Sequence, residues 1–317
     1  PRGGHRRVRL RPGVPVIGAD GRERPVAIVR VPATSANVGV GFDCLGLALD
    51  LTATFLMAPA EQLEIVGCEE RFRGEDNLVW QSYLDACGRL GVEPVPLHIT
   101  ILSPIPLSGG LGSSSACVIA GIAGAMALSG DGFDRERALE LACTEEGHPD
   151  NVAPALLGGL VSSFVDDGRT TSTRMGVADN LRFVAIAPPY EVRTADARRV
   201  LPEEVSRETA VWQMGRCVAT VRALELGDAD LLAKACHDRL HEPYRAKLIP
   251  DYEALRSAAL DAGACAFMIS GSGSTMLAVA DGDEAAGRVS SALAETCPGY
   301  WLRALAANTL GTTVEVH

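Results

Sequence analysis

The stretch that decides the fold is Pro106-Leu-Ser-Gly-Gly-Leu-Gly-Ser-Ser-Ser-Ala116, which joins a predicted strand at residues 95–102 to a predicted helix at 113–128. Glycine lets the backbone turn tightly and approach a ligand. The first turn of a helix adds unpaired N–H donors at the positive end of its dipole. The alternative is an ordinary glycine turn with a serine cap. Seven glycine and serine residues within 108–115 instead favour a site for an anion such as phosphate.

A second loop, residues 32–46, sets Asn37 and Asp43 among small residues. An amide and a carboxylate in such a loop either face one pocket together or bond to the backbone of their own turn. The spacing favours neither interpretation over the other. A further glycine-rich turn, residues 269–276, joins two apolar segments and by itself indicates little about function.

An acidic cluster follows in Glu145-Glu-Gly-His-Pro-Asp-Asn151. Oxygen ligands suit Mg²⁺, which takes one or two carboxylates together with nucleotide phosphates. The alternative is a solvated acidic helix end with His148 on the surface. That alternative is weaker for the whole cluster than for a single glutamate, so the cluster predicts a site for a cation or a substrate.

Two segments place arginines beside structural breaks. Arg198 or Arg199 belongs to a short predicted helix, and Arg245 follows a proline in His241-Glu-Pro-Tyr-Arg245. The guanidinium fork matches a carboxylate. For either segment taken alone, a surface charge pair is the simpler interpretation.

Composition narrows the class of protein. The 317 residues carry 29 Lys+Arg and 40 Asp+Glu, a net charge of −11, with 47% hydrophobic and 5% aromatic residues. The apolar content excludes a disordered chain. An acidic chain with few aromatic residues lacks the positive field and the stacking surfaces of a general nucleic-acid binder. Taken globally, the negative charge also argues against an anionic substrate, which conflicts with the phosphate site.

Other features concern location. The most apolar run, residues 116–128, is too short for the roughly 20 residues of a membrane span, so no membrane association is expected. The 9 cysteines are scattered without a Cys-x-x-Cys pair or zinc spacing, which favours a reducing, cytoplasmic compartment. Residues 1–24 hold seven arginines against two acidic residues, a local net charge of +5, and are expected to form a flexible basic arm outside the folded part.

Strands and helices are expected without strict alternation, which indicates an α+β fold. The paired prolines at 188 and 189 are the best signal for a domain boundary, since proline interrupts both helix and sheet. The predicted helices after the acidic cluster span residues 196–200, 209–226, 229–240, 252–262 and 284–296. Before it, helices are predicted at residues 77–90, with Asp76 as a candidate cap, and at 135–146. A Gly/Pro turn is expected within the acidic cluster, after the second of these helices.

Together these motifs resemble the GHMP small-molecule kinase superfamily, and within it the homoserine kinases. Residues 32–46 are similar to the family's P-A-T-S-A-N-x-G-x-G-F-D-x-L-G, and 106–114 to its P-x-x-x-G-L-G-S-S loop. Residues 148–159 resemble H-P-D-N-x-A-P-A-x-L-G-G, where mevalonate kinases show P-S-G-x-D. The T-x-x-A-R-x-x-L-P segment at 194–202 and E-P-Y-R at 242–245 also resemble homoserine kinases. One departure is Ser274, where the family usually has proline.

The resemblance implies a two-domain α+β fold. An N-terminal ATP-binding domain similar to ribosomal protein S5 domain 2 is expected at residues 25–187. A ferredoxin-like C-terminal domain is expected at 188–317, with the active site between the two. The resemblance also implies transfer of a phosphoryl group from ATP to the hydroxyl of L-homoserine, a step of threonine biosynthesis, by a cytoplasmic homodimer.

The resemblance assigns roles residue by residue. Mg²⁺ is expected on Ser114 and Glu146, with Glu140 as the rival ligand. Asp43 accepts a hydrogen bond from the reacting hydroxyl, either as a base or only to orient it. The residues expected to hold the nucleotide phosphates are Pro106, Leu107, Ser108, Gly109, Gly110, Leu111, Gly112, Ser113, Ser114 and Ser115. Those expected to hold the substrate are Arg198 and Arg245 for its carboxylate, and Asn37 and Asp150 for its ammonium group, with His148 and Asn151 nearby.

Two alternatives remain open from the sequence. One is another member of the superfamily, such as a mevalonate-pathway kinase, which has less use for the arginine pair. The other is a nucleotide-binding regulator that keeps the scaffold without catalysis. Intact Asp43, Ser114 and Glu146 speak against a regulator, because the fold alone does not require all three.

Overall fold

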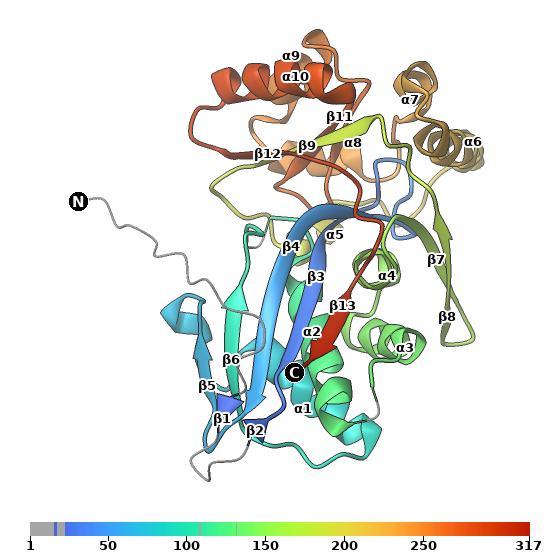
Figure 1. Ribbon diagram of the computed structural model, residues 1–317. Coiled ribbons are helices and arrows are strands. Elements are labelled where there is room, and N and C mark those ends of the chain that lie inside the picture. The colour runs from blue at the N-terminus through green and yellow to red at the C-terminus, as the bar shows by residue number, and fades with distance from the viewer. Residues whose placement is uncertain (1–15, 18–22, 108, 131) are drawn as a thin grey trace.

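A computed structural model of the chain describes residues 16–17, 23–107, 109–130 and 132–317 (Figure 1). Most of the predicted basic arm lies outside these residues. Its described parts, β1 (Val16–Ile17) and β2 (Glu23–Arg24), pair with each other in antiparallel fashion. The rest of the described chain forms two β-sheets with helices packed on them, which confirms the predicted α+β class.

The larger sheet has seven strands, in the order β13-β3-β4-β6-β5, with β7 attached to β4 and β8 to β7. Its central strands β3 and β4 are long and antiparallel, and their pairing shifts between Pro32 and Ala33, because a proline has no N–H for a regular ladder. The strands are β3 (Ala27–Ala36), β4 (Leu45–Pro59), β5 (Glu64–Val66), β6 (Leu97–Leu102), β7 (Leu160–Asp166), β8 (Arg169–Met175) and β13 (Thr313–Val316).

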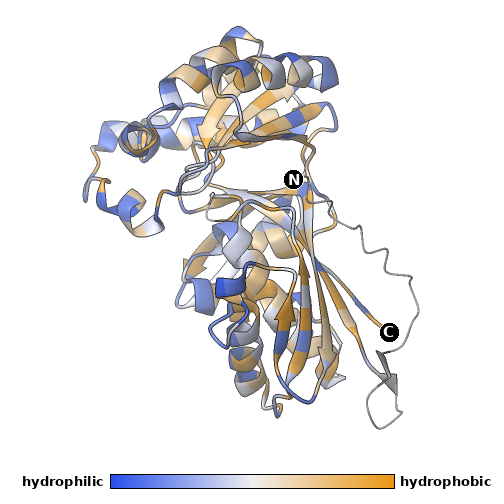
Figure 2. Cartoon of the chain, turned by 90° about the vertical axis from the view of Figure 1, so that its left-hand side faces the viewer, coloured by the Kyte–Doolittle hydropathy of each residue, from blue (hydrophilic) through white to orange (hydrophobic). Residues whose placement is uncertain are grey.

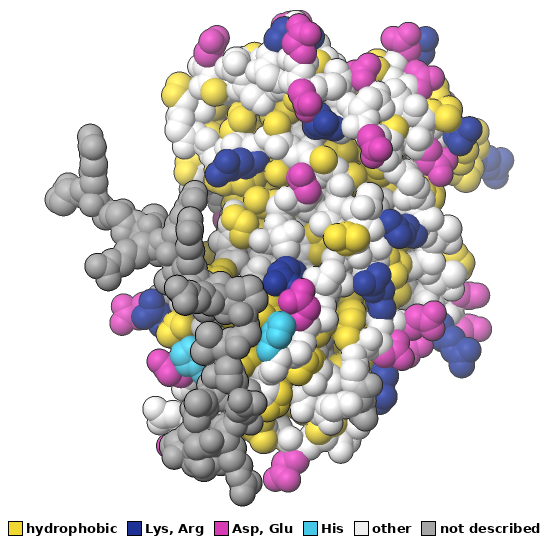
Figure 3. All heavy atoms as spheres, viewed as in Figure 1, with side chains coloured by type: hydrophobic (Ala, Val, Ile, Leu, Met, Phe, Trp, Pro, Cys, Tyr) yellow, Lys and Arg dark blue, Asp and Glu magenta, His cyan; other side chains and the backbone are white. Residues whose placement is uncertain are grey.

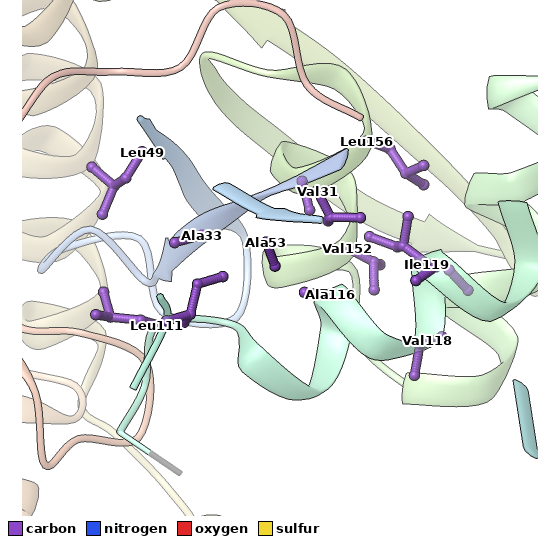
Figure 4. Packing of buried hydrophobic residues seen from close by; sticks show 14 of the residues in the cluster. Val31, Ala33, Leu49, Ala53, Leu111, Ala116, Val118, Ile119, Val152 and Leu156 are labelled. Carbon is purple, nitrogen blue, oxygen red and sulfur yellow. The ribbon is translucent and has the colours of Figure 1, made fainter. Parts of the chain in front are cut away.

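Four helices accompany this sheet. Helices α2 and α4 pack on β3 and β4, while α1 and α3 pack on α2. The helices are α1 (Leu78–Leu90), α2 (Ser113–Ser129), α3 (Arg135–Glu146) and α4 (Pro149–Leu157), with a short 3₁₀ turn at Glu70–Phe72. In Figure 4, Val31, Ala53, Ile119 and Val152 lie together in the layer between the strands and these helices.

Two sequence expectations are wrong in this half. The Gly/Pro turn expected in the acidic cluster is only a short break, because a further helix, α4, begins at Pro149, where proline is tolerated since the first helical N–H has no partner. Helix α1 is capped by Asn77 and not by Asp76, since the Asn77 side chain accepts a hydrogen bond from the Val79 N–H. Both differences concern helix starts, where a neighbouring polar residue can take the cap.

The smaller sheet has the antiparallel order β10-β11-β9-β12. Its strands are β9 (Leu181–Ala187), β10 (Ala266–Ile269), β11 (Met276–Asp281) and β12 (Trp301–Leu305). The helices of this half are α5 (Thr194–Arg199), α6 (Arg207–Leu226), α7 (Ala229–Ala235), α8 (Glu242–Arg245), α9 (Tyr252–Asp261) and α10 (Gly282–Thr296), with a 3₁₀ turn at Ala246–Leu248. The helix predicted at 229–240 stops at Ala235, and residues 236–241 leave it.

Strand alternation ties the two halves together. On β9, Phe183 and Ala185 belong to the large core shared with the other sheet, whereas Val184 and Ile186 face α9 and α10. Apolar residues follow the strands of both sheets in Figure 2, and polar ones lie on the outer helix faces and turns. The predicted boundary after residue 187 does not coincide with the sheets, because β9 precedes it yet joins the smaller sheet, and β13 follows it yet joins the larger one.

Candidate active site

The phosphate loop, residues 106–115, is shaped by two glycines that no other residue can replace without strain. Gly110 and Gly112 have φ of 87° and 69°, in the left-handed region. A Cβ atom on Gly110 would lie 2.2 Å from the Ser270 carbonyl oxygen, and one on Gly112 would lie 2.1 Å from the Thr34 Oγ1. The loop therefore runs directly against two other segments. Ser108 lies outside the described residues.

The glycine-rich turn at residues 269–276 is one of those segments, so it does more than join two strands. The Ser270 hydroxyl donates to the Gly110 carbonyl at 2.6 Å, and the Thr275 N–H donates to the Gly109 carbonyl at 2.8 Å. From the other side, the Thr34 N–H donates to the Leu111 carbonyl at 3.2 Å. These bonds fix the loop that precedes α2 before any ligand is present.

The start of α2 is built to receive negative charge. Its N-cap is Gly112, which has no side chain to occupy the free N–H groups of the first turn. The hydroxyls of Ser114 and Ser115 donate to the two carboxylate oxygens of Glu146 at 3.3 and 3.1 Å. The end of α3 thus brings a carboxylate to the helix start, as the predicted Ser114–Glu146 pairing requires.

The three nearby glutamates have different surroundings. Glu140 is exposed, and its backbone carbonyl accepts the Thr144 hydroxyl. Glu145 turns toward α1, where it accepts a hydrogen bond from Ser82, and burial raises the pKa of its carboxyl. Among these three, it is Glu146 that faces the phosphate loop.

The loop at residues 37–43 carries Asn37 and Asp43 in an unusual backbone conformation. Asn37, Val38, Gly39 and Asp43 have φ of 71°, 45°, 67° and 55°. The Asn37 side chain ties the loop together, because its Oδ1 accepts from the Asp43 N–H at 2.9 Å and its Nδ2 donates to the Gly271 carbonyl at 2.9 Å. Asn37 thus bonds to the backbone of its own turn through Oδ1 and to the backbone of a distant segment through Nδ2.

Asp43 faces Arg198. The two guanidinium nitrogens of Arg198 donate to the two carboxylate oxygens of Asp43 at 3.0 and 3.2 Å. This bidentate bond raises the pKa of Arg198. Both side chains are about two-fifths exposed, at 42% and 36%, so a ligand can reach them. By contrast Arg199 points away and pairs with Asp196.

Arg245 is buried, and its positive charge is held by carbonyl groups. Its Nε donates to the Ala197 carbonyl at 3.2 Å and its Nη1 to the Gly271 carbonyl at 2.9 Å. Burial lowers the pKa of Arg245, opposed by the nearby charges of Asp43 and Asp150. Within the described part of the chain no carboxylate pairs directly with Arg245, so a ligand carboxylate can serve as its counter-ion.

The first turn of α4 contributes the remaining predicted residues. The His148 Nδ1 and the buried Asp150 Oδ1 lie 3.0 Å apart, and this bond raises the pKa of His148 despite its partial burial. The Asn151 Oδ1 accepts the Thr34 hydroxyl at 2.8 Å. The close approach of α4 to β4 needs Gly46, where a Cβ would lie 1.9 Å from the Asp150 carbonyl oxygen.

A cavity of about 430 Å³ runs along the phosphate loop. Part of its lining is polar, with the serines of α2, Glu146, His148 and Asn151. Another part is apolar and suits a nucleobase, a feature that the sequence motifs did not indicate. The apolar lining comes from Phe72, Leu78, Ile101 and Leu107. Asp43, Arg198 and Arg245 lie outside this lining. Arg245 and Asn37 both donate to the carbonyl of Gly271, which is part of the lining.

The chain matches two family models. Residues 77–159 match the N-terminal domain of the GHMP kinases, and residues 220–299 match their C-terminal domain. The first match contains the phosphate loop and the acidic cluster. The second contains α8, with Arg245, and the glycine turn that braces the loop.

Similar proteins cover nearly the whole chain. A homoserine kinase of Clostridium botulinum is 37% identical over 289 residues, which is 90% of this chain and 97% of the relative. One of Thermus thermophilus is 43% identical over 257 residues, 81% of this chain and 87% of the relative. The crystal structure of homoserine kinase from Cytophaga hutchinsonii superposes with a TM-score of 0.83 at 33% identity, covering 92% of this chain and 97% of that one. The chain belongs to the GHMP kinases and, within them, to the homoserine kinase family.

Proposed function

We propose that the protein transfers the γ-phosphoryl group of ATP to the side-chain hydroxyl of L-homoserine, giving ADP and O-phospho-L-homoserine in threonine biosynthesis. One observation carries this proposal. Residues 270 and 271 contact the phosphate loop through Gly110, the substrate loop through Asn37, and the buried Arg245. A phosphate site, an acidic residue and a carboxylate site therefore meet around one turn, as a kinase for a small amino acid needs.

The nucleotide would lie in the cavity, with its base against the apolar lining residues and its phosphates at the start of α2. The backbone N–H groups and the hydroxyls of Ser113 and Ser114 would bind the phosphate oxygens.

This arrangement also explains how an acidic protein can bind an anionic ligand. Oriented N–H dipoles act locally, whereas a net charge of −11 acts at long range. On the face shown in Figure 3 the acidic and basic side chains are interspersed and form no single negative patch.

Ser114 and Glu146 fit a Mg²⁺ ion, because both offer oxygen atoms and lie within 3.3 Å of each other. When bound, the ion would neutralise part of the charge on the transferring phosphate. Glu140 lacks this placement. Glu146→Gln is expected to raise the Mg²⁺ concentration for half-maximal activity about tenfold, equivalent to about 1.4 kcal/mol. Glu140→Gln serves as the matched variant, and a larger effect from it would reverse the assignment.

The amino acid would lie between Asp43 and the two arginines. Its carboxylate would take the fork of Arg198 and the free donors of Arg245. Its ammonium group would face Asp150, with His148 and Asn151 beside it. Asn37 would contribute mainly by holding the loop, since its Oδ1 and Nδ2 already bond to backbone groups.

Phosphoryl transfer relies on positioning and charge stabilisation more than on covalent help from the protein. The homoserine oxygen would attack the γ-phosphorus, the bond to the bridging oxygen would break, and ADP would leave with that electron pair. Asp43 would accept the hydrogen bond of the hydroxyl and orient it. The proton of that hydroxyl would then pass to the Asp43 carboxylate or to solvent.

One assay separates this proposal from its alternatives. ADP release is measured with homoserine, with mevalonate and without acceptor. Release with homoserine alone, together with a new phosphate-ester signal in ³¹P NMR, supports the proposal. Release with mevalonate favours another superfamily activity. Nucleotide binding without release in any case favours a regulator.

The homodimer, the cytoplasmic location and the domain bounds of 25–187 and 188–317 stay predictions. Sedimentation of the purified protein tests the first of them. Among the described residues, no helix has both the length and the apolar character that a bilayer span requires.

A further inference from the structure

The substrate loop at residues 37–43 is held in a conformation that its own sequence does not favour. Three of its residues other than glycine have positive φ, and Val38, a β-branched residue, is among them at 45°. Such conformations are strained and persist where the surroundings hold them. Some other part of the molecule must therefore fix this loop.

Two buried side chains from the second half of the chain provide that support. The Gln213 Nε2 donates to the Val40 carbonyl at 2.7 Å, and the His241 Nε2 lies 2.7 Å from the Gly39 carbonyl. Gln213 is 4% exposed and His241 is 0% exposed. Without them, two carbonyl groups of the loop would lose their hydrogen-bond partners in a buried place, which costs free energy.

Asp238 bonds to the Gln213 side chain and to the backbone of His241. Its Oδ1 accepts a second hydrogen bond from the Gln213 Nε2 at 2.6 Å. Its Oδ2 accepts the backbone N–H groups of Leu240, His241 and Glu242 at 3.0, 2.7 and 2.8 Å. This explains why the predicted helix at 229–240 ends at Ala235: residues 238–242 instead wrap around the Asp238 carboxylate.

The environment of His241 selects one form of its ring. A carbonyl can only accept, so Nε2 must carry the proton that bonds to Gly39. The other nitrogen, Nδ1, is buried and has no partner among the described residues. Burial lowers the pKa of His241 against the opposing charge of Asp238, with Arg245 and Asp43 as the other charged groups nearby. The ring is therefore neutral when the loop is in place.

His241 also connects the loop to the substrate arginine. Phe42 stacks on the His241 ring with 5.3 Å between centroids, and the Arg245 guanidinium lies 5.1 Å from the Phe42 centroid. Phe42 directly precedes Asp43. Through these contacts, the loss of the Gln213 or His241 side chain would also alter the positions of Asp43 and Arg245.

We propose that Gln213 and His241 are positioning residues, which hold the carbonyls of Val40 and Gly39 and so aim Asp43 at the substrate hydroxyl. The proposal rests on the proposed function. Neither residue lines the cavity for the nucleotide. Their loss should therefore act on the homoserine side of the reaction and leave nucleotide binding alone.

The first test is Gln213→Met, which keeps the length of the side chain and removes its hydrogen bonds. We expect kcat/KM for homoserine to fall about 10- to 100-fold, with ADP affinity within twofold of wild type by calorimetry. The matched control is Met214→Ala, a neighbour on α6 whose side chain is 61% exposed. Equal kcat/KM in Gln213→Met and wild type would overturn the proposal. If Gln213→Met does not fold, the shorter Gln213→Asn is judged by the same criteria.

The second test is rescue at His241. His241→Leu removes the donor to Gly39, whereas His241→Gln restores an N–H donor near the same place. We expect His241→Gln to recover most of the kcat that His241→Leu loses, at equal nucleotide affinity. Equal kcat in the two variants would contradict the positioning role. A wild-type protein without homoserine-dependent ADP release would instead refute the proposed function, so the two failures are distinguishable.

Discussion

The two loops of the site are built in opposite ways. The phosphate loop offers backbone N–H groups at the start of α2 as donors, and its turn depends on Gly110 and Gly112, although Ser270 braces it from 160 positions away. The substrate loop offers side chains, and residues more than 150 positions away hold it. Arg198 is 155 positions from Asp43, and His241 is 202 positions from Gly39.

Because of this difference, we expect nucleotide affinity to depend on one loop and the reaction with homoserine to depend on the other. Changes in the backbone of the phosphate loop should mainly affect the nucleotide. Changes in the side chains around residues 37–43 should mainly affect homoserine and the chemical step. Substitutions in the two loops can show whether the effects on the nucleotide and on homoserine are separate.

Asp43→Asn is expected to give the largest effect. Asparagine tolerates the positive φ of this position, so the loop should persist while the carboxylate is lost. We expect kcat to fall about 100- to 10,000-fold, the range of general acid–base effects, with ADP affinity unchanged. Steady-state rates and calorimetry measure the two quantities. Unchanged turnover would remove Asp43 from the reaction.

Gly112→Ala is expected to act on the nucleotide side. Its Cβ would lie 2.1 Å from the Thr34 Oγ1 at a φ of 69°, so the loop must move. We expect the KM for ATP to rise about 10- to 100-fold, and kcat at saturating ATP to change less. Gly109→Ala is the milder comparison, because its Cβ would meet only the Thr275 Oγ1, at 2.9 Å. A selective rise in the KM for homoserine would contradict the separation.

The sequence predicts the nucleotide side better than the substrate side, for a physical reason. A strand, a glycine turn and a helix start are contiguous, so one motif reveals the phosphate site. The bracing by Ser270 and Thr275 arises only when β10 and β11 pack beside that loop, and no local pattern announces it.

On the substrate side, Gln213 is a residue whose role the sequence could not predict. In the sequence it is one polar residue in a helix of low amphipathicity, and its partners Val40 and Asp238 lie in separate segments. The early end of the helix before residue 238 was missed for the same reason, since the Asp238 carboxylate competes with helical hydrogen bonds through side-chain contacts. The strand predicted at residues 95–102 and the long helices predicted at 113–128, 209–226, 252–262 and 284–296 are confirmed.

Arg198→Leu tests the substrate side with a smaller effect. Loss of a charge-assisted bidentate contact costs about 1.5–3 kcal/mol, so the KM for homoserine should rise about 10- to 100-fold. Arg199→Leu is the matched control, because the Arg199 side chain is 73% exposed and pairs with Asp196. The KM for ATP should change little in either variant. Equal effects of the two substitutions would place Arg198 outside the substrate site.

The smallest expected effect is on the stability of the protein. It concerns Glu242, beside the residues that support the substrate loop. Glu242 is buried next to His241, and burial raises the pKa of its carboxyl from 4.5 to about 8. Since the folded state binds this proton more tightly than the unfolded chain, stability should fall as the pH rises from about 5 to 8. Glu242→Gln keeps an acceptor for the Ile269 N–H, whose bond to the carboxylate measures 2.7 Å, and removes the titration.

Thermal unfolding of both proteins between pH 5 and pH 8.5 measures this effect. We expect the free energy of unfolding of Glu242→Gln to exceed that of wild type by at least about 1.4 kcal/mol at pH 8, the value of one pKa unit, and by less at pH 5. Glu253→Gln, at an exposed position of α9, should show the same pH dependence of stability as wild type. Glu242 also neighbours His241, which supports the substrate loop. A loss of homoserine affinity in wild type over the same pH range, absent in Glu242→Gln, would show that this support affects substrate binding. Parallel stability curves for wild type and Glu242→Gln would show that this carboxyl does not titrate in the folded protein as its burial requires.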